Sequence, residues 1–500
     1  MGATQRFATA HDRTEVHRLL GLSWQELIGD SNSPELKRMM NAALDDLAKP
    51  DLFAVKYCNP ATSGGAALWV AEADGHLSGC VGVHKTNDFE CELVRMVVDP
   101  KHRREGVGKM LVEQVAAYAK EHAYADIWLM CGSASGQALY HACGFRAVEM
   151  SSWVAGQLAC RFVRAVQPYR FDCVLITGGV HGNELVGPAL LQRWSGNAPE
   201  VIESHHVDVA RKSLRTFTWL ANPRAVEKAV RFIDRDLNRC FALGDAAVDG
   251  YETERARALL EVCPKEEYKG GAVGRGRFQM LVDLHSTASN MGMCLMAIAG
   301  STFNLRLAKH VMRAVSSNPR YPVRLVLADS PTRAANNNID SVTPLGIAIE
   351  VGPLVHGTYG DLELLDATQR GVHEIMNFLD AENVSGAAVD APALDFTRHP
   401  STTQKVTRVD SITAYVSYKP VHFPRDAVSG KVRAAIHPSL LGRDFCELKR
   451  GDPLFIDLET RETVRNDETE VTYPIFIAEP AYLAGGVAMV LTKKKEFVVY

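Results

Sequence analysis

The chain has 500 residues and a formal net charge of −4 at pH 7, with 55 Lys and Arg residues against 59 Asp and Glu residues. This balance excludes the strongly basic surface that binding to a nucleic-acid backbone requires, so we expect no nucleic-acid partner. At roughly 150 residues per domain, the length predicts two to four domains.

The eleven cysteines form no C-x-x-C pair, and several lie within apolar runs. This usage is typical of reduced thiols, so we expect a cytoplasmic protein without a disulfide framework. The first residues lack an apolar signal core, and no apolar stretch is long enough to span a bilayer, so we expect no membrane partner. The sequence leaves the formation of homo-oligomers open.

Two stretches rich in small and polar residues, 151–168 and 381–405, mark candidate domain boundaries. We therefore expect three domains, at residues 1–160, 168–388 and 389–500.

Residues 91–145 have the pattern strand, glycine-bearing loop, helix, strand, helix. The segment "CELVRMVVDP" is apolar and β-branched, "KHRREGVGK" follows it, and apolar residues then recur at helical spacing. A helix start exposes unpaired backbone N–H groups, and Gly106 and Gly108 remove side chains that would keep a phosphate away from them. This segment predicts a pyrophosphate site at the start of a helix.

Residues 103–108, "RREGVG", match the R/Q-x-x-G-x-G/A loop of the GNAT acetyltransferases, and "ADIWLMC" and "SGQALYHACGF" follow in the order of that family. The chain resembles this family over residues 5–155. The resemblance implies a mixed α/β domain that binds acetyl-CoA along the strand before the loop, with the pyrophosphate on the loop amides. The cofactor-binding residues that it implies are Val98, Arg103, Arg104, Gly106, Val107 and Gly108.

Two further side chains of this domain each have two interpretations. Tyr140 occupies the position at which many members of the family place a tyrosine near the leaving thiolate, where it would donate a proton. Alternatively, Tyr140 packs a helix onto the sheet. Glu92 on the central strand would help to deprotonate an acceptor amine, or it would simply face solvent.

A second set of motifs begins at residues 178–187, "GGVHGNELVG", which follow the apolar run "DCVLIT" and hold His181 and Glu184. If the chain turns there from strand into helix, both side chains would reach one ion. Imidazole and carboxylate suit Zn²⁺, and a catalytic zinc needs three protein ligands and one open position. Further along, "QMLVDLHSTASNMG" ends another apolar strand with Asp283 and His285. His285 is the predicted third ligand, and Asp283 is either a partner of a ligand histidine or a strand-end cap.

A third apolar strand, "LGIAIEVGP", ends with Glu350. An isolated Glu in such a run is costly to bury without a role, so we predict that it is the carboxylate base of the site. Between the metal-ligand segments lies "VRFIDRDLNRCF", which contains Arg231, Asp236, Asn238 and Arg239. Adjacent Asn and Arg side chains form a fork for a carboxylate.

These motifs, with "IHPSLLGRDFCELKRGDPLF" and "TYPIFIAEPAY" further on, resemble aspartoacylase and aminoacylase III within the zinc carboxypeptidase-like succinylglutamate desuccinylase group. The resemblance runs from residue 170 to the last residue. It implies a carboxypeptidase-like α/β domain, followed by a smaller β-rich domain that covers the active site.

The resemblance also implies a role for each matched residue. The zinc ligands would be His181, Glu184 and His285. Glu350 would activate water and then protonate the leaving amine, and Arg231 would stabilise the oxyanion. The residues that would contact the substrate are Asn238 and Arg239, at its α-carboxylate, and Tyr482, which would close over it.

One departure from the family concerns the substrate side chain. Aspartoacylases proper carry an arginine shortly before the I-E-V-G-P segment, where it pairs with the side-chain carboxylate of the substrate. This chain has Asp340 and Ser341 in that region, and its nearest arginine is Arg333. Because an acid would repel the carboxylate that the cation attracts, we expect neutral or aromatic N-acetyl amino acids, or N-acetylated cysteine conjugates, to be cleaved better than N-acetylaspartate.

Taken together, the motifs predict a bifunctional α/β enzyme with two small-molecule activities. One is the zinc-dependent hydrolysis of N-acyl amino acids to an amino acid and a carboxylate. The other is the acetyl-CoA-dependent acetylation of amino acids or other amines. Two alternatives stay open: the N-terminal domain is a non-catalytic acyl-CoA sensor that regulates the hydrolase, or the hydrolase is a zinc carboxypeptidase. The motifs do not separate these alternatives, because fold and ligand set are shared between them.

Overall fold

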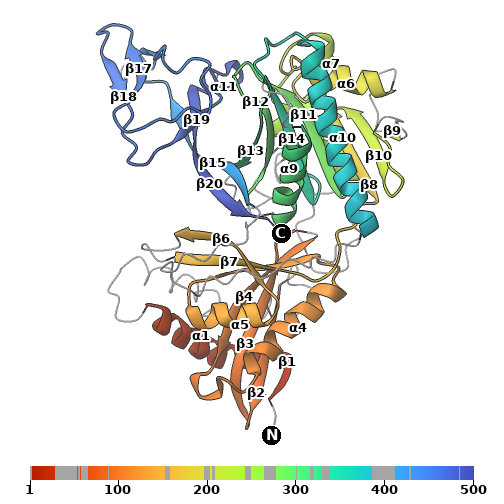
Figure 1. Cartoon of the computed structure of the whole chain (residues 1–500), viewed down its shortest axis with the longest axis vertical. Helices are drawn as coiled ribbons and strands as arrows, with labels where there is room; N and C mark the ends of the chain where they lie inside the picture. Colours follow the sequence, from red (N-terminus) through yellow and green to blue (C-terminus); the bar gives the residue numbers. More distant parts are fainter. Residues whose placement is uncertain are drawn as a thin grey trace.

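The computed structural model contains two large β-sheets with helices on their faces and a small third sheet (Figure 1). The first sheet, drawn in red to orange, lies at one end of the molecule, and the other two lie at the opposite end. The described residues are 3–28, 53, 57, 66–87, 89–152, 158–195, 203–204, 209–241, 249–263, 278–299, 301–315, 320–328, 338–385, 411–426, 429–483 and 485–499.

The first part of the chain contains β1 (Thr4–Phe7), α1 (Arg13–Ile28), β2 (Ala67–Ala73), β3 (His76–Lys85), β4 (Glu90–Val98), α4 (Val107–Glu121), β5 (Asp126–Cys131), α5 (Ala134–Ala142), β6 (Arg146–Ser152) and β7 (Leu158–Ala165). Within the described residues these strands form a seven-stranded sheet in the order β1-β2-β3-β4-β5-β7-β6. On one face, alternate strand residues form an apolar core with α4 and α5. On the other face, α1 packs over β3 and β4, in an apolar cluster that also includes residues of β2.

The two central strands of this sheet separate along their length. β4 and β5 are parallel, but they pair only where residues 90–92 lie beside residues 126–128. Beyond this point β4 continues to Val98 and β5 to Cys131 without pairing with each other. The resulting fork opens toward the loop that leads from β4 into α4.

The second part of the chain contains β8 (Cys173–Gly178), α6 (Val186–Ser195), β9 (Glu203–Ser204), β10 (Arg215–Leu220), α7 (Pro223–Glu227), α8 (Tyr251–Val262), β11 (Met280–Ser286), β12 (Gly292–Ile298), α9 (Thr302–Val315), β13 (Val323–Ala328), β14 (Leu345–Gly352) and α10 (Leu362–Ser385). The last part contains β15 (Ser411–His422), β16 (Ala434–Ile436), β17 (Pro453–Asp457), β18 (Thr463–Arg465), β19 (Tyr473–Ile475), α11 (Pro480–Leu483) and β20 (Val487–Val498). Within the described residues they form a ten-stranded sheet, in the order β19-β20-β15-β13-β12-β14-β11-β8-β10-β9, and a three-stranded sheet, β16-β17-β18.

The centre of the large sheet consists of the parallel strands β8, β11 and β14. Every residue of β8 and β11 is buried, and burial on both faces agrees with the mainly apolar sequences in which these strands begin. β12 runs antiparallel to β14, so the direction of the sheet changes beside this group. The order of the strands reverses at β8, because β10 pairs on one side of it and β11 on the other. The carboxyl ends of parallel strands at such a reversal are a common place for a ligand.

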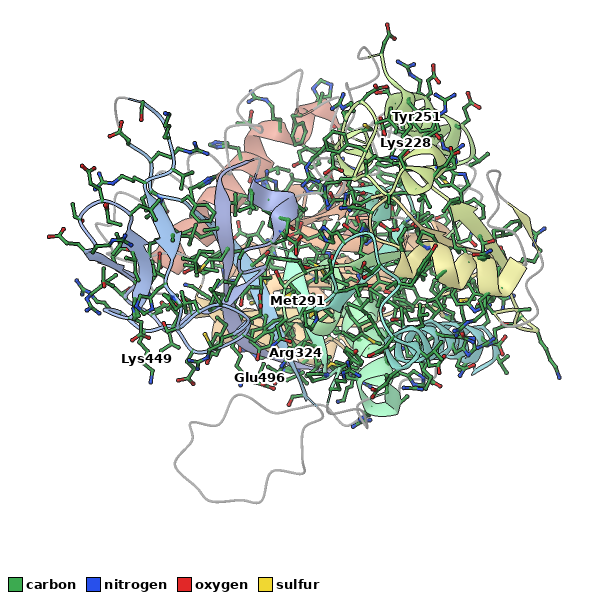
Figure 2. The ribbon with its side chains drawn as sticks, turned by 90° about the horizontal axis from the view of Figure 1, so that it is seen from above. Lys228, Tyr251, Met291, Arg324, Lys449 and Glu496 are labelled. Atoms are coloured by element: carbon green, nitrogen blue, oxygen red, sulfur yellow. The ribbon has the colours of Figure 1, made fainter. Side chains whose placement is uncertain are left out.

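The last part of the chain is joined to the second through its strands. β15 pairs with β13, and β20 pairs with β15, so the large sheet continues into the C-terminal segment. Arg324 on β13 donates a hydrogen bond to the carbonyl oxygen of Met291 (3.2 Å; both are labelled in Figure 2), and its guanidinium lies 4.5 Å from the centre of the Phe445 ring. The C-terminal part is therefore fixed against the edge of the sheet that carries β12 and β13.

A buried polar cluster joins the first part to the second. The Tyr169 hydroxyl lies 2.9 Å from Asp126 Oδ2 and 3.2 Å from Glu90 Oε1. Thr302 and Ser301, at the start of α9, donate to Asp126 and Glu90 over 2.8 and 2.9 Å respectively. The paired ends of β4 and β5 thus dock onto the N-terminal end of α9.

The α/β class and the succession of three parts expected from the sequence are confirmed, with β15 and β20 extending the sheet of the second part. β7 ends at Ala165, between the expected end of the first domain at 160 and the expected start of the second at 168. The boundary expected at 388–389 lies outside the described residues. None of the described helices combines the length and the hydropathy needed to cross a membrane.

Candidate active site

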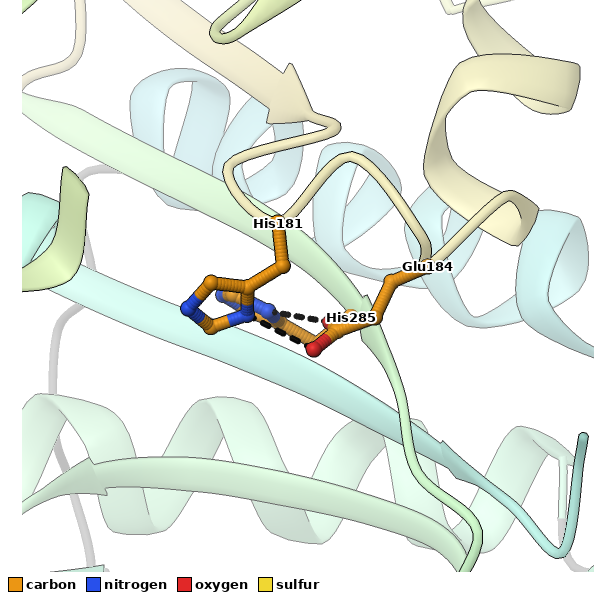
Figure 3. Close-up of side chains that lie close together, drawn as sticks. All are labelled: His181, Glu184 and His285. Carbon is orange, nitrogen blue, oxygen red and sulfur yellow. Dashed lines mark hydrogen bonds and ion pairs between the residues drawn. The ribbon is translucent and has the colours of Figure 1, made fainter. Parts of the chain in front are cut away.

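Two histidines and one glutamate meet at the carboxyl ends of β8 and β11 (Figure 3). His181 Nδ1 lies 2.6 Å from Glu184 Oε1, and His285 Nδ1 lies 2.8 Å from Glu184 Oε2. One ligand atom from each residue lies within 4.8 Å of the others, and all three side chains are buried. The structure thus brings together the three residues that the sequence predicted as metal ligands.

Glycines allow the loop after β8 to reach this position. Gly179 has a φ of +68°, and a Cβ atom at Gly182 would lie 2.0 Å from the carbonyl carbon of Ala225 in α7. The loop between β8 and α6 therefore passes directly over the α7 backbone. Only glycine fits at Gly182, and the close approach fixes the backbone position of the neighbouring His181.

Carboxylates hold the outer nitrogen of each imidazole. His181 Nε2 lies 3.1 Å from Asp236 Oδ1, and His285 Nε2 lies 2.5 Å from Asp283 Oδ2. Asp283 also accepts a hydrogen bond from Thr177 Oγ1 over 2.7 Å. Of the two interpretations of Asp283, these contacts agree with the partner of a ligand histidine. Such contacts fix the ring orientation and point the inner nitrogens at an ion.

The donor set fits zinc. Two imidazole nitrogens and one carboxylate are the ligands of many catalytic zinc sites, which keep a further position open. Burial would raise the pKa of Glu184, but the charges and hydrogen bonds of His181 and His285 hold it well below its ordinary value. The carboxylate is therefore ionised, as a metal ligand must be.

Glu350 lies beside this cluster because of strand register. It occupies β14 directly next to His285 on β11, in parallel pairing, so the two side chains share a face of the sheet. Burial and the negative charge of Glu184 raise the pKa of Glu350 well above its ordinary value. A carboxyl group that holds a proton this strongly can exchange one with a substrate.

Arg231 reaches the same cluster from the segment before Leu237. Its Nη1 donates to Glu184 Oε1 over 3.2 Å, and its Nη2 donates to Asp236 Oδ2 over 2.9 Å. Gly182 N donates to the carbonyl oxygen of Arg231 over 3.1 Å, which ties this segment to the His181 loop. A guanidinium held at the edge of a metal site can stabilise negative charge on a substrate oxygen.

Asn238 and Arg239 face the segment that follows residue 337. Asn238 Oδ1 accepts a hydrogen bond from Ile339 N over 2.9 Å, and Arg239 Nη1 donates to Asn338 Oδ1 over 2.9 Å. The fork predicted for a carboxylate thus contacts the segment that contains Asp340. Arg333, the other residue of this expectation, lies outside the described residues.

The C-terminal part brings Tyr482 and Glu479 to the site. Burial and the charge of Glu350 raise the pKa of Tyr482, while the charges of Arg239 and Arg231 lower it. The Tyr482 phenol therefore lies close enough to Glu350, Arg231 and Arg239 to interact with their charges.

Glu479 is a residue that sequence reasoning missed. Its buried carboxylate accepts hydrogen bonds from Thr287 Oγ1, from Ala288 N over 3.0 Å and from Ser289 Oγ over 3.3 Å. These residues directly follow His285. Glu479 therefore connects the C-terminal part, through hydrogen bonds, to the segment after β11. Its signal was a single acid within the apolar run "YPIFIAEPAY".

The residues predicted to bind an acyl carrier lie in the first part of the chain. Arg103 Nε donates to the carbonyl oxygen of Val98 over 3.3 Å, which folds the loop back on the end of β4. Gly106 has a φ of +87° and caps α4, and a Cβ atom at Gly108 would lie 3.1 Å from Leu139. The predicted cofactor-binding residues thus lie at the fork between β4 and β5, in a different sheet from the candidate metal cluster: Val98, Arg103, Arg104, Gly106, Val107 and Gly108.

Tyr140 packs in the core of the first part. It is 6 % exposed and meets Phe145 edge-on, with 5.6 Å between the ring centres. Burial raises its pKa far above the ordinary value. These contacts agree with the packing interpretation of Tyr140.

A cavity of about 400 Å³ lies where the first part meets the second. Asp126, Tyr169 and Arg306 are among its lining residues, and the metal cluster is not. The candidate active site is therefore identified by the cluster of His181, Glu184 and His285, and not by this cavity.

Comparisons with known proteins agree with this arrangement. The family model "Acetyltransferase (GNAT) family" matches residues 35–145, "Succinylglutamate desuccinylase/Aspartoacylase catalytic domain" matches residues 171–379, and "AstE/AspA barrel-sandwich hybrid domain" matches residues 410–494. An N-acyl-aromatic-L-amino acid amidohydrolase (carboxylate-forming) B of Danio rerio is 34% identical, over 65% of this chain and 94% of that protein.

Two further matches cover the same region. A probable aspartoacylase of Trichodesmium erythraeum is 32% identical, over 66% of this chain and 99% of that protein. The crystal structure of murine aminoacylase 3 superposes with a TM-score of 0.54 at 30% identity, over 66% of this chain and 98% of that chain.

Proposed function

Since this chain belongs to the succinylglutamate desuccinylase/aspartoacylase family and carries a domain of the GNAT acetyltransferase family, we propose that it is a bifunctional enzyme of N-acyl amino acids. Its residues from 171 onward form an amidohydrolase of the aminoacylase and aspartoacylase type. This part releases an amino acid and a carboxylate. The N-terminal part transfers an acetyl group from acetyl-CoA to an amine.

The metal of the hydrolase is zinc, held by His181, Glu184 and His285. When bound, zinc supplies a Lewis acid that polarises a carbonyl oxygen and acidifies water. Asp236 and Asp283 orient the two imidazoles from behind, so that the inner nitrogens face the ion.

Glu350 is the general base and general acid of hydrolysis. It accepts a proton from the attacking water, whose oxygen forms a bond to the acyl carbon of the substrate. The carbon–nitrogen bond then breaks, and Glu350 returns the proton to the departing amine nitrogen. Arg231 stabilises the negative charge that develops on the acyl oxygen. The position of Glu350 next to His285 in the strand register supports this role.

Asn238 and Arg239 hold the α-carboxylate of the substrate, and Tyr482 closes over it from the C-terminal part. The substrate side chain then points toward the segment with Asp340 and Ser341. We assign a preference for neutral or aromatic N-acetyl amino acids, or N-acetylated cysteine conjugates, over N-acetylaspartate, because Asp340 would repel a second carboxylate.

The acetyltransferase assignment is supported by the fork between β4 and β5 and by the loop that caps α4. The pantetheine arm of acetyl-CoA lies along β4 in this assignment, and its pyrophosphate contacts the amides of Val107 and Gly108. Gly106 and Gly108 leave those amides accessible.

The observation that carries the hydrolase assignment is the cluster of His181, Glu184 and His285 with Glu350 in register beside it. The experiment is a screen of N-acetyl-L-tyrosine, N-acetyl-L-aspartate and unblocked dipeptides with the zinc-loaded full chain. We expect fast release of acetate from the tyrosine derivative and slow release from the aspartate derivative.

Two results would contradict parts of this proposal. Cleavage of dipeptides with no cleavage of N-acetyl amino acids would establish a zinc carboxypeptidase instead. A strong preference for N-acetylaspartate that Arg333→Ala removes would show that a loop arginine binds the second carboxylate, against the assigned specificity.

A further inference from the structure

Four polar or aromatic side chains share one face of the N-terminal sheet beside the fork. Glu92 on β4 lies directly opposite His84 on β3 and directly beside Trp128 on β5. Arg161 on β7 lies opposite Met130, two residues beyond Trp128 on the same face. Strand register alone therefore gathers Glu92, His84, Trp128 and Arg161 on one surface.

This surface differs in chemistry from the reverse side of the same strands. The intervening residues Cys91, Leu93, Ile127 and Leu129 are buried in the apolar core under α4 and α5. The four side chains are each only partly buried. The sheet thus has an apolar side buried under α4 and α5 and a side on which these four side chains are partly exposed.

Contacts within the described part of the chain do not explain the position of the Glu92 carboxylate. Among the residues that the structure describes, none donates a hydrogen bond to its carboxylate or forms an ion pair with it. Burial raises the pKa of Glu92 to about 7, and the positive charge of Arg161 acts against that rise. A carboxylate that titrates near neutral pH and remains accessible is suited to accept a proton from a bound amine.

Arg161 places a guanidinium on the same surface. Its Cζ lies 4.4 Å from the centre of the Trp128 ring, and Trp128 Nε1 donates to Thr86 Oγ1 over 2.8 Å. The indole is fixed, so the guanidinium stacked on it is fixed as well. A guanidinium has five N–H donors in a planar fork that matches a carboxylate, so it can bind one in addition to its existing contacts.

Glu92 is also the last residue of β4 that pairs with β5. An acyl thioester that lies along the unpaired part of β4 would end at this point. The surface therefore presents, beside the acyl group, a proton acceptor and a fixed cation.

We propose that the acetyl acceptor of the N-terminal domain is a free α-amino acid, with its carboxylate bound by Arg161 and its ammonium group held against Glu92. The inference rests on the acetyltransferase function proposed above and names its substrate class. Glu92 accepts one proton from the ammonium group, and the nitrogen lone pair forms a bond to the thioester carbonyl carbon. The carbon–sulfur bond breaks, and the sulfur leaves with the electron pair and takes the second proton of the nitrogen.

Other acceptor amines fit this surface less well. A simple amine brings no carboxylate to Arg161, and a polyamine brings a second cation against it. The amine of a protein N-terminus has an amide in place of the carboxylate. The paired acid and guanidinium match a zwitterion, which is also the product class of the hydrolase.

The experiment uses the full chain with Glu350→Gln, so that N-acetyl products accumulate. Acetyl-CoA is supplied with α-amino acids and with the amines that lack only the carboxylate: tyrosine and tyramine, phenylalanine and phenethylamine, histidine and histamine. N-acetyl products are measured by mass spectrometry. We expect at least one amino acid to be acetylated with a kcat/KM tenfold or more above that of its matched amine.

Variants separate the two roles. Arg161→Gln should raise the KM of the amino acid about 10- to 100-fold and leave the KM of the matched amine unchanged, because a charge-assisted contact to the carboxylate is lost. Any change in kcat that follows from the altered charge next to Glu92 should be the same for both acceptors. Glu92→Gln should lower kcat for both. Arg164→Gln is the control, because Arg164 lies on the same strand but pairs with Glu113 on the α4 side.

Two outcomes would overturn the inference in distinguishable ways. Acetylation of the amines as fast as the amino acids, or an Arg161→Gln effect of equal size on both, would show that the carboxylate is not recognised. Acetyl-CoA binding without transfer to any compound would contradict the acetyltransferase function itself and leave the sensor alternative.

Discussion

At the scale of single residues, the candidate metal site includes carboxylates outside the set of proposed metal ligands. Asp283 lies between Thr177 and His285, and Asp236 lies between His181 and Arg231. Each of them fixes one imidazole through its outer nitrogen. If the proposed zinc site is correct, the free energy of zinc binding includes these contacts, which are already formed without the metal.

Asp283→Asn tests this dependence. The amide keeps the size of the side chain but removes the charge next to His285, so we expect the zinc affinity to fall about 10- to 100-fold. Competition with a chelator of known affinity measures the change. Asp361→Asn, at a surface carboxylate that pairs with Arg320, is the matched control. Equal affinities of the two variants would mean that Asp283 does not tune the site.

The candidate site residues could be located in the sequence because each interrupts or follows an apolar strand. Burying a charged side chain there costs free energy unless the charge has a partner or a function. His181, His285 and Glu350 all have this signal in the sequence. Glu479 has it too, but its partner Thr287 is 192 residues away, so its contact depends on how the last part of the chain packs. The spacing of apolar residues along the sequence does not show which distant segments contact each other.

At the scale of elements, the strands could be predicted and their order could not. The apolar runs of β8, β11 and β14 are long enough to identify buried strands. The antiparallel placement of β12 beside β14, and the addition of β15 and β20 to the same sheet, follow from tertiary packing. Neither leaves a local pattern in the sequence.

The close approach of the His181 loop to α7 leads to a prediction at this scale. In Gly182→Ala the new methyl group would lie 2.0 Å from the Ala225 backbone, so the loop or the helix must move. We expect a loss of about 1–3 kcal/mol of stability and a large loss of hydrolysis, because His181 and Glu184 move with the loop.

Thermal unfolding and acetate release measure the two effects. Gly21→Ala is the control, because a Cβ atom at this position in α1 would meet no atom within 4 Å. A Gly182→Ala variant with the stability and activity of Gly21→Ala would show that the loop tolerates the methyl group and that the contact does not position His181.

At the scale of the whole molecule, two parts with separate candidate sites share a buried polar junction. Glu90 and Asp126 are register partners on β4 and β5, and both contact Tyr169 and the start of α9. The sequence predicted both parts, but it could not predict this docking, because two acids at strand starts give no indication of partners 176 and 211 residues away.

This junction predicts a pH dependence of stability. Burial, followed by the charge of Asp126, raises the pKa of Glu90 to about 7, while Arg161, Ser301 and Tyr169 act against the rise. The folded chain therefore binds a proton that the unfolded chain releases near pH 4.5. Stability from this group is fully present below that pH and is lost as the pH rises through 7, on the order of 3 kcal/mol.

Glu90→Gln removes the titration and keeps the shape of the side chain. We expect its Tm to exceed that of the unmodified chain at pH 8, with a smaller difference or none near pH 5. Thermal unfolding of both chains across this range makes the comparison. Parallel Tm curves for the two chains would contradict the protonation of Glu90 in the folded state.

The central claim is that His181, Glu184 and His285 bind a zinc ion on which hydrolysis depends, separately from the N-terminal domain. The most direct measurement is acetate release from N-acetyl-L-tyrosine by the full chain before chelation, after chelation and after return of zinc, with acetyl-CoA binding followed in parallel. We expect about one zinc per chain, hydrolysis that is lost and then restored with the metal, and unchanged acetyl-CoA binding. In Glu350→Gln we expect retained zinc with hydrolysis reduced about 10²- to 10⁴-fold. Full hydrolytic activity in a metal-free preparation would contradict the claim.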